Sequence, residues 1–303
     1  MPEVSVIIPT YNGRHKIGKT LKSLREQSFK DFETVVVVDG STDDTTSYLK
    51  NEDWGLQKLR VKVQSNKGRA VVRNNGANYA RGDFLIFFDD DVIVDRLCVE
   101  SHLSMLREHQ GMISAGRAIE GESVGSSDFQ NFKVSLAKKW EENLLAASLP
   151  LEEKDLFMAA ANFGINKTDF LRLGGFDEEL KDAEDFEFVR RAHSRGIRTF
   201  YNTTAVAVHN DPVTCKEYIL RLRDYKRSHE RLALMNKIYL KDSLPQYKSS
   251  IVKKLLYSIF AIPLWVSLID NFRDWLFLPK GLRYKFYFLV IVALSYHYSE
   301  RDL

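Results

Sequence analysis

An apolar run at residues 84–88 (Phe-Leu-Ile-Phe-Phe) leads directly into three aspartates, Asp89, Asp90 and Asp91. Continuous apolar runs of this length, rich in β-forming residues, are typical of strands buried on both faces of a sheet. Three adjacent carboxylates repel one another unless positive charge lies among them, and Mg²⁺ and Mn²⁺ prefer carboxylate and phosphate oxygens. Because ligands of open α/β sheets bind beyond the carboxyl ends of strands, the junction predicts a site for a divalent cation and a phosphate-bearing ligand. The alternative interpretation is a solvated acidic turn that caps the next helix.

Two earlier apolar runs also end in polar residues. Residues 34–38 precede Asp39 and a Gly-Ser-Thr-Asp-Asp turn, and residues 4–8 precede the segment Pro-Thr-Tyr-Asn at 9–12. The serine, threonine and aspartates of the turn suit a helix cap, whereas Asp39 stands before the cap, at the end of the strand. Three strands would thus deliver polar groups to one edge of one sheet, which favours a ligand site over a solvated turn.

Strands and helices alternate through the first half of the chain. We expect strands at residues 4–8, 34–38, 60–64 and 84–88, helices at 69–80 and 95–109, and, further along, strands at 112–118 and 204–208 and helices at 134–147 and 183–194. Ile17, Leu21 and Leu24 lie on one face of a further helix after the first strand. This alternation predicts an α/β fold in which helices flank a mostly parallel sheet.

A series of short motifs runs in order through the first two thirds of the chain. They are VSVIIPTYN at 4–12, QSFKDFE at 27–33, VVDGSTD at 37–43, NKGRA at 66–70 followed by Arg73, FDDD at 88–91, GGFDE at 174–178, and Glu184 with Asp185 followed by Arg190. The series resembles that of family 2 glycosyltransferases of the GT-A fold. The resemblance implies metal-dependent transfer of a sugar, with inversion, from a nucleotide diphosphate sugar to an acceptor hydroxyl. One departure is Val38, which stands where the family usually has the first of two aspartates.

The resemblance also implies roles for residues on the donor side. Asp91 would bind a Mg²⁺ or Mn²⁺ ion that bridges the two phosphates, with Asp89 and His209 completing the ligand set, although a lone histidine at a strand end is also often structural. Asp39 and Asp90 would hold the ribose or the base. The rest of the nucleotide site would be formed by Thr10, Tyr11, Asn12, Gly68 and Arg73.

On the acceptor side, the resemblance makes Asp185 the general base of a single displacement. Glu184 beside it, Asn162 and residues 175–177 would form the edge that receives the acceptor. The alternative is a purely structural role for Glu184 and Asp185, because acids at a helix N-terminus interact favourably with the helix dipole. The GGFDE segment has a similar alternative, a glycine helix cap followed by a turn.

Three other functions are compatible with parts of the sequence. A sugar-phosphate nucleotidyltransferase would need a glycine-rich first loop, but the segment 9–14 holds a single glycine. A nucleotide-sugar-binding module with weak or lost turnover would not require the carboxylates at 39, 89–91 and 185. The third function, nucleic-acid binding, is weakened because the sequence contains no recognisable nucleic-acid-binding module. The motifs leave the nucleotide, the sugar and the acceptor open.

The composition changes beyond Pro212. We expect a GT-A catalytic domain at 1–212, with a nucleotide-binding half at 1–110 and an acceptor half at 111–212, and a helical extension at 213–303. Residues 216–303 carry 16 Lys and Arg against 8 Asp and Glu, and the apolar runs at 255–269 and 286–298 are shorter than the ~20 residues that span a bilayer. A basic amphipathic helix at 218–239 beside such runs predicts peripheral contact with a membrane and a lipid-linked acceptor. The alternative is that these helices pack on the catalytic domain or form a homo-oligomer interface.

Two further observations bear on location. Cys98 and Cys215 are far apart and show no metal-binding spacing, so we interpret them as thiols of a reducing compartment. The first strand follows Met1 almost at once, without a visible signal peptide. We therefore expect a cytoplasmic protein, with the extension at the cytoplasmic face of the membrane.

Overall fold

The computed structural model describes residues 1–109, 111–121, 127–209, 212–235, 240, 250–271 and 278–303. The chain forms two compact units, residues 1–121 with 141–211 and residues 122–140 with 212–303. The helix α5 (Asp128–Leu145) contributes residues to both units.

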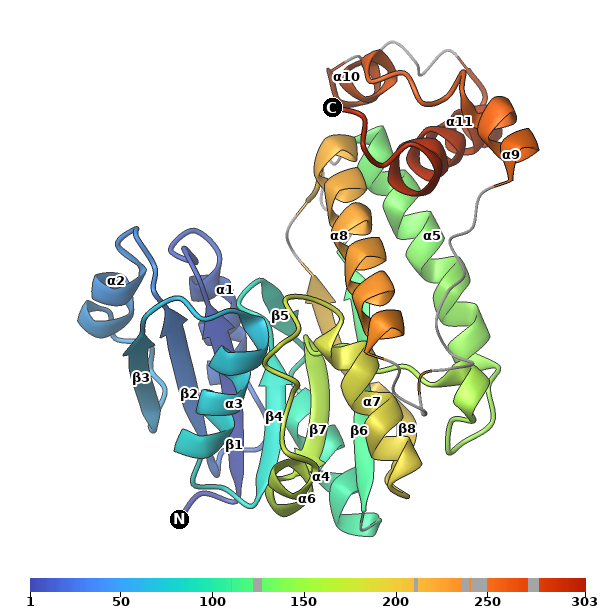
Figure 1. Ribbon diagram of the computed structural model, residues 1–303. Coiled ribbons are helices and arrows are strands. Elements are labelled where there is room, and N and C mark those ends of the chain that lie inside the picture. Colours follow the sequence, from blue (N-terminus) through green and yellow to red (C-terminus); the bar gives the residue numbers. More distant parts are fainter. Residues whose placement is uncertain (110, 122–126, 210–211, 236–239, 241–249, 272–277) are drawn as a thin grey trace. The chain divides into compact units, whose positions relative to one another are not determined.

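Among the described residues, the first unit contains one eight-stranded sheet with the order β3-β2-β1-β4-β7-β6-β8-β5. The strands are β1 (Val4–Thr10), β2 (Phe32–Asp39), β3 (Leu59–Gln64), β4 (Phe84–Phe88), β5 (Val92–Val94), β6 (Met112–Glu120), β7 (Asn162–Asn166) and β8 (Arg198–His209). From β3 to β4 all neighbours are parallel, and β7 and β5 run antiparallel to their partners (Figure 1). The predicted α/β class is confirmed, with a sheet whose first half is parallel and whose second half is mixed.

Two apolar layers cover the faces of this sheet. Successive residues of a strand point to opposite faces, so Ile7 packs in one layer, while Val6 and Ile8 pack in the other. Helices α3 (Arg69–Tyr79), α6 (Lys167–Leu173) and α7 (Glu184–Ser194) contribute to the first layer. The second layer includes residues of α1 (Ile17–Arg25), α2 (Thr45–Asn51) and α4 (Cys98–Glu108). The sheet is thus the middle of three layers.

The second unit is helical. It contains α8 (Cys215–Leu234), α9 (Ile251–Tyr257), α10 (Leu264–Asn271), α11 (Lys280–Val292) and a π-helical turn (Ala293–His297), together with the first part of α5. Its core combines aliphatic and aromatic side chains, and Phe129 and Phe132 of α5 pack with Tyr287. Asp128 accepts hydrogen bonds from Arg283 and from the Tyr287 hydroxyl, which ties α5 to α11.

The helix predicted at 218–239 begins earlier than expected. It starts after Thr214, whose side chain forms a reciprocal capping box with Glu217, and residues 236–239 lie outside the described part of the chain. Within the described residues, no helix is both long enough and apolar enough to cross a membrane.

Candidate active site

Polar side chains connect the loops that follow the three parallel strands β1, β2 and β4. The Asn12 backbone N–H donates to the Ser41 hydroxyl at 2.9 Å, and the Thr42 N–H donates to Asn12 Oδ1 at 2.8 Å. The Thr10 hydroxyl donates to Asp90 Oδ2 at 2.5 Å. Asn12 has a φ of 49°, a left-handed conformation that asparagine tolerates better than most residues. The ends of β1, β2 and β4 therefore form one connected edge.

Two residues that the sequence did not single out complete this edge. Lys16 Nζ lies 2.9 Å from Asp90 Oδ1 and 3.8 Å from Asp91 Oδ2, so a positive charge stands between two of the three carboxylates. Burial raises the pKa of Asp90 to about 6, against the opposing effect of Lys16. A Cβ at Gly13 would stand 2.1 Å from Thr10 Oγ1 and 2.5 Å from Asp90 Oδ2, so any larger residue would displace one of these side chains. In the sequence, Gly13 resembles an ordinary loop glycine and Lys16 resembles a solvated lysine at the start of a helix. Local patterns therefore gave no signal for either residue.

Asp39 organises the loop after β3. Its Oδ1 accepts from the N–H of Lys67 at 2.9 Å and from the Gln64 side chain at 2.8 Å, and its Oδ2 accepts from the N–H of Gly68 at 2.9 Å. Gly68 has a φ of 94°, which favours glycine, and a Cβ there would meet nothing within 4 Å. The backbone at Gly68 is therefore open to a ligand. Tyr11, which follows directly after β1, is 49% exposed.

Arg73 of α3 lies between two carboxylates that are remote in sequence. Its Nη2 is 2.6 Å from Asp89 Oδ1, and its Nη1 is 2.5 Å from Glu184 Oε1, with the Arg73 side chain 5% exposed and that of Glu184 4% exposed. Burial works against the charged guanidinium, but the charges of Asp89 and Glu184 outweigh it and raise the pKa of Arg73. The sequence suggested that Arg73 reaches the nucleotide, whereas the structure gives it two protein partners.

Asp185 follows Glu184 in the first turn of α7. Its Oδ1 accepts from the Phe186 N–H at 2.7 Å and its Oδ2 from the Ala160 N–H at 3.3 Å. Burial, and after it the negative charge of Glu184, raise the pKa of Asp185 from 3.8 to about 7, against the two hydrogen bonds and the charge of Arg73. Ala183, the N-cap, has a φ of 61°, and such strained non-glycine residues cluster at functional sites. Asp185 therefore has the environment of a proton acceptor that works near neutral pH.

Asp91 and His209 meet where β4 ends and β8 ends. His209 Nδ1 is 3.5 Å from Asp91 Oδ1. Although burial lowers the pKa of His209, the hydrogen bond to Asp91 and the negative charges around it outweigh burial and raise that pKa. A carboxylate oxygen and an imidazole nitrogen are both donors that suit a divalent transition metal. In the described part of the chain, no group of three or more His, Cys, Asp or Glu side chains is arranged to hold an ion.

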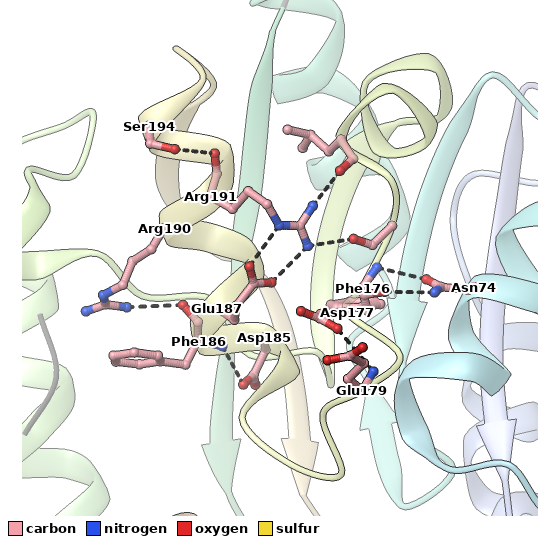
Figure 2. A network of polar contacts seen from close by, with 12 residues as sticks. Asn74, Phe176, Asp177, Glu179, Asp185, Phe186, Glu187, Arg190, Arg191 and Ser194 are labelled. Atoms are coloured by element: carbon pink, nitrogen blue, oxygen red, sulfur yellow. Dashed lines mark hydrogen bonds and ion pairs between the residues drawn. The ribbon is translucent and has the colours of Figure 1, made fainter. Parts of the chain in front are cut away.

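The GGFDE loop is fixed from two sides (Figure 2). From α7, Arg191 donates to the carbonyls of Leu173 and Gly175 and forms a bidentate pair with Glu187, which is completely buried. From α3, Asn74 accepts from the Phe176 N–H and donates to the Phe176 carbonyl, both at 2.9 Å. The loop begins with Gly174 in the left-handed conformation as the cap of α6, as the alternative interpretation of the motif predicted.

Asn162 opens β7 and pairs in register with Phe88, the residue before Asp89. It is completely buried, its Oδ1 is 2.8 Å from His102 Nε2, and its Nδ2 donates to the Ala205 carbonyl at 2.8 Å. Burial also lowers the pKa of His102 to about 4, so this pair is a neutral core contact. The described hydrogen bonds of the Asn162 side chain are with protein groups, and its acceptor role stays a prediction.

The three-layer fold and the acidic strand ends define a GT-A type glycosyltransferase fold. Residues 5–170 match the family model described as glycosyl transferase family 2, which is more than half of the chain. The chain therefore belongs to glycosyl transferase family 2.

Relatives and solved structures agree with this membership. The GalNAc(5)-diNAcBac-PP-undecaprenol beta-1,3-glucosyltransferase of Campylobacter jejuni is 29% identical over 185 residues, 59% of this chain and 56% of that protein's length. The chain thus spans only a little more than half of this relative. The mannosyltransferase PcManGT from Pyrobaculum calidifontis, solved with GDP-Man and Mn²⁺, has a TM-score of 0.65 at 19% identity, covering 99% of this chain and 88% of that one. Staphylococcus aureus TarS 1–349 with UDP-GlcNAc has a TM-score of 0.54 at 19% identity, covering 98% and 91%.

Proposed function

We propose that this chain is an inverting glycosyltransferase that moves a sugar from a nucleotide diphosphate sugar to the hydroxyl of a glycan or lipid-linked acceptor. The observation that carries the proposal is the position of Arg73, which pairs with Asp89 after β4 and with Glu184 at the start of α7. One guanidinium joins the strand end where the diphosphate would lie to the helix that carries Asp185. The nucleotide sugars bound by PcManGT and TarS support the same donor class.

Asp185 is the general base in this proposal. Its carboxylate would accept the proton of the acceptor hydroxyl while the oxygen attacks the anomeric carbon from the side opposite the diphosphate, which inverts the configuration. Ala160 and Phe186 hold the carboxylate through their backbone N–H groups. The raised pKa of Asp185 suits this role, because a base is most effective when its pKa lies near the working pH.

Asp91, His209 and Asp89 would hold a divalent cation. A bound Mg²⁺ or Mn²⁺ would neutralise the charge that develops on the leaving diphosphate. Mg²⁺ is usually bound by one or two carboxylates plus substrate phosphates, so the chain need not supply a closed cluster. Lys16 stands beside Asp91 and would supply further positive charge at the same place. The Mn²⁺ in the PcManGT complex supports a divalent cation in this fold.

The nucleoside would lie over the ends of β1, β2 and β4. Tyr11, Thr10 and Asn12 would line its pocket, the open backbone at Gly68 would allow close approach, and Asp39 and Asp90 would fix the ribose or base side. Asp39 and Asp90 already hold their loops by hydrogen bonds, so their contribution is to position those loops as well as to contact the ligand. Glu184 and residues 175–177 would form the acceptor edge.

The donor and the reaction can be tested together. The full chain is incubated with UDP-, GDP- and dTDP-sugars and Mn²⁺, and release of the nucleoside diphosphate is measured with and without EDTA. We expect one nucleotide class to be consumed, and the matching nucleoside diphosphate at 100 times its Kd to stabilise the fold by about 2.7 kcal/mol. Binding without any release would identify an inactive binding module, and no binding of any nucleotide would contradict the proposal.

We also propose that residues 1–212 form the catalytic domain of a cytoplasmic enzyme and that 213–303 contact the cytoplasmic face of a membrane. Within the second unit, Ile251, Val252 and Leu255 of α9 are 87%, 77% and 75% exposed, next to Lys253 and Lys254. Exposed apolar side chains beside lysines suit an anionic lipid surface. The undecaprenol-linked acceptor in the name of the C. jejuni relative supports a lipid-linked acceptor.

Vesicle flotation tests the membrane contact. The full chain should float with anionic vesicles at low salt and not with neutral ones, and Val252→Glu with Leu255→Glu should abolish flotation. Exposed Leu171 of α6 offers the matched control, since Leu171→Glu should leave flotation unchanged. A wild-type chain that ignores anionic vesicles, or that forms a homo-oligomer which the double variant disrupts, would contradict a membrane role for this surface.

A further inference from the structure

Arg190 of α7 is a buried arginine with few partners. It neighbours Arg191 in sequence, but its side chain points away from the Glu187 pair and lies against Phe186 (Figure 2). The guanidinium carbon is 3.7 Å from the centre of the Phe186 ring, and Nη1 donates to the Phe186 carbonyl at 3.4 Å. Arg190 is only 9% exposed. The stacking fixes the plane of the guanidinium and leaves its nitrogen edge for other contacts.

The neighbouring Arg191 shows what a satisfied buried arginine looks like in this fold. Arg191 is also 9% exposed, yet it pairs with Glu187 and donates to two carbonyls. In contrast, Nε of Arg190 is buried and has no hydrogen-bond partner among the described residues, and no described carboxylate lies within ion-pair distance of it. Burial lowers the pKa of Arg190 to about 10, even though the negative charges of Glu153 and Asp185 oppose this effect.

A buried, unpaired guanidinium is costly, because charged groups inside a protein are normally paired or fully hydrogen-bonded. A ligand with a negative charge would supply the missing partner. The planar fork of arginine matches the oxygens of a phosphate, which it binds through two parallel hydrogen bonds. The buried Nε of Arg190, which has no hydrogen-bond partner among the described residues, is the donor that such a contact would use.

We propose that Arg190, stacked on Phe186, binds a phosphate group carried by the acceptor. This inference rests on the proposed function, which places the donor's diphosphate at the ends of β1 and β4 and leaves the Asp185 side for the acceptor. Arg190 lies on the same helix as Asp185, five residues further along the chain. An acceptor anchored there by its phosphate would present a hydroxyl to the base. The acceptor class is therefore a phosphorylated glycan or polyol, or a phosphate-linked lipid, rather than a neutral sugar.

The test uses thermal unfolding of the full chain saturated with Mn²⁺ and with the nucleoside diphosphate that stabilises it. Phenyl phosphate, inorganic phosphate, benzoate and phenyl β-glucoside are then added separately. We expect phenyl phosphate to raise the Tm further, with benzoate and phenyl glucoside ineffective and inorganic phosphate clearly weaker. Arg190→Met keeps an aliphatic side chain over Phe186 but removes the guanidinium. It should lower the affinity for phenyl phosphate by roughly 10–100-fold, the loss expected for hydrogen bonds to a charged group. Arg190→Lys keeps the charge but not the planar pair of donors. Its affinity for phenyl phosphate should lie between those of the wild type and Arg190→Met.

Arg198→Met is the matched control, because exposed Arg198 opens β8 and its loss removes the same charge. This control should respond to phenyl phosphate like the wild type, and all variants should keep the nucleoside diphosphate response. An unchanged phenyl phosphate response in Arg190→Met, or no response in the wild type, overturns the inference. An equal response to benzoate makes the site a carboxylate site, and an equal response to inorganic phosphate removes the acceptor assignment. If no nucleoside diphosphate binds, the proposed function fails, while the phosphate series on the free chain still reports on Arg190.

Discussion

Replacing Arg191 by methionine should destabilise the first unit strongly. Arg191 compensates the Glu187 carboxylate, which is completely buried, and supplies hydrogen bonds to the carbonyls of Leu173 and Gly175. Removing one partner of a buried ion pair costs about 3–5 kcal/mol, because the other charge is left uncompensated. Small domains have only about 5–15 kcal/mol of stability in total. We therefore expect Arg191→Met to remove a large share of the free energy of unfolding.

The double variant Arg191→Met with Glu187→Leu separates the charge from the packing. It removes the buried carboxylate, so the remaining loss is that of the Arg191 hydrogen bonds to the carbonyls of Gly175 and Leu173, the second of which keeps Arg195 as a donor. We expect the double variant to be more stable than Arg191→Met by about 2 kcal/mol or more, since replacing both partners of a buried pair by apolar groups is often close to neutral. Urea unfolding at neutral pH measures each free energy of unfolding.

Arg195→Met provides the matched control. Arg195 is exposed at the end of the same helix and donates to the same Leu173 carbonyl, at 3.3 Å. Its loss should cost no more than about 0.5 kcal/mol, as for most surface substitutions. The reasoning is refuted if Arg191→Met costs less than about 1 kcal/mol or if the double variant is no more stable than Arg191→Met.

Three further predictions concern the catalytic machinery. Since Asp185 must be ionised to accept a proton and its pKa is raised to about 7, kcat/KM should be level above this pH and fall as the pH drops through it; a profile that stays level down to pH 5 would count against the assignment. Asp91→Ala should abolish the metal-dependent part of nucleoside diphosphate binding in calorimetry, and turnover that continues undiminished in EDTA would contradict a metal role. Gly13→Ala should weaken nucleoside diphosphate binding by at least tenfold, because its Cβ would displace Thr10 or Asp90, while Gly281→Ala, with open space around it, should not.

Strands β1, β2 and β4 of the first unit were predictable because they are almost entirely buried, and residues 84–88 form β4 with the same bounds. Residues 60–64 fall within β3, which is only half-buried, whereas β5 and β7 were not predicted. The start of α5 was not predictable in the same way. We expected this helix from residue 134, but it begins at Asp128, because Phe129 and Phe132 pack in the core of the second unit. Tertiary packing of the two phenylalanines holds a helical turn in which Asp128 and Asn131 have low intrinsic helix propensity.

The sequence indicated residues of the candidate site, but it did not indicate which of them form ion pairs with one another. The motifs named Arg73, Asp89 and Glu184, yet nothing in the sequence indicates that one guanidinium joins these two carboxylates. Similarly, Glu187 and Arg191 have the spacing of an ordinary exposed helical pair, and only their burial distinguishes them. Pairings between remote elements depend on packing, which local patterns do not encode.

The central claim, that Asp185 is the general base of sugar transfer, is tested most directly by comparing Asp185→Asn with Glu184→Gln. Both changes remove one carboxylate charge with little change of size, but only the first removes the proposed proton acceptor. Transfer to acceptor at saturating donor should fall by about 10²–10⁴-fold in Asp185→Asn and much less in Glu184→Gln, with nucleoside diphosphate affinity nearly unchanged in both. Near-wild-type transfer by Asp185→Asn, or the reverse order of the two variants, would contradict the claim.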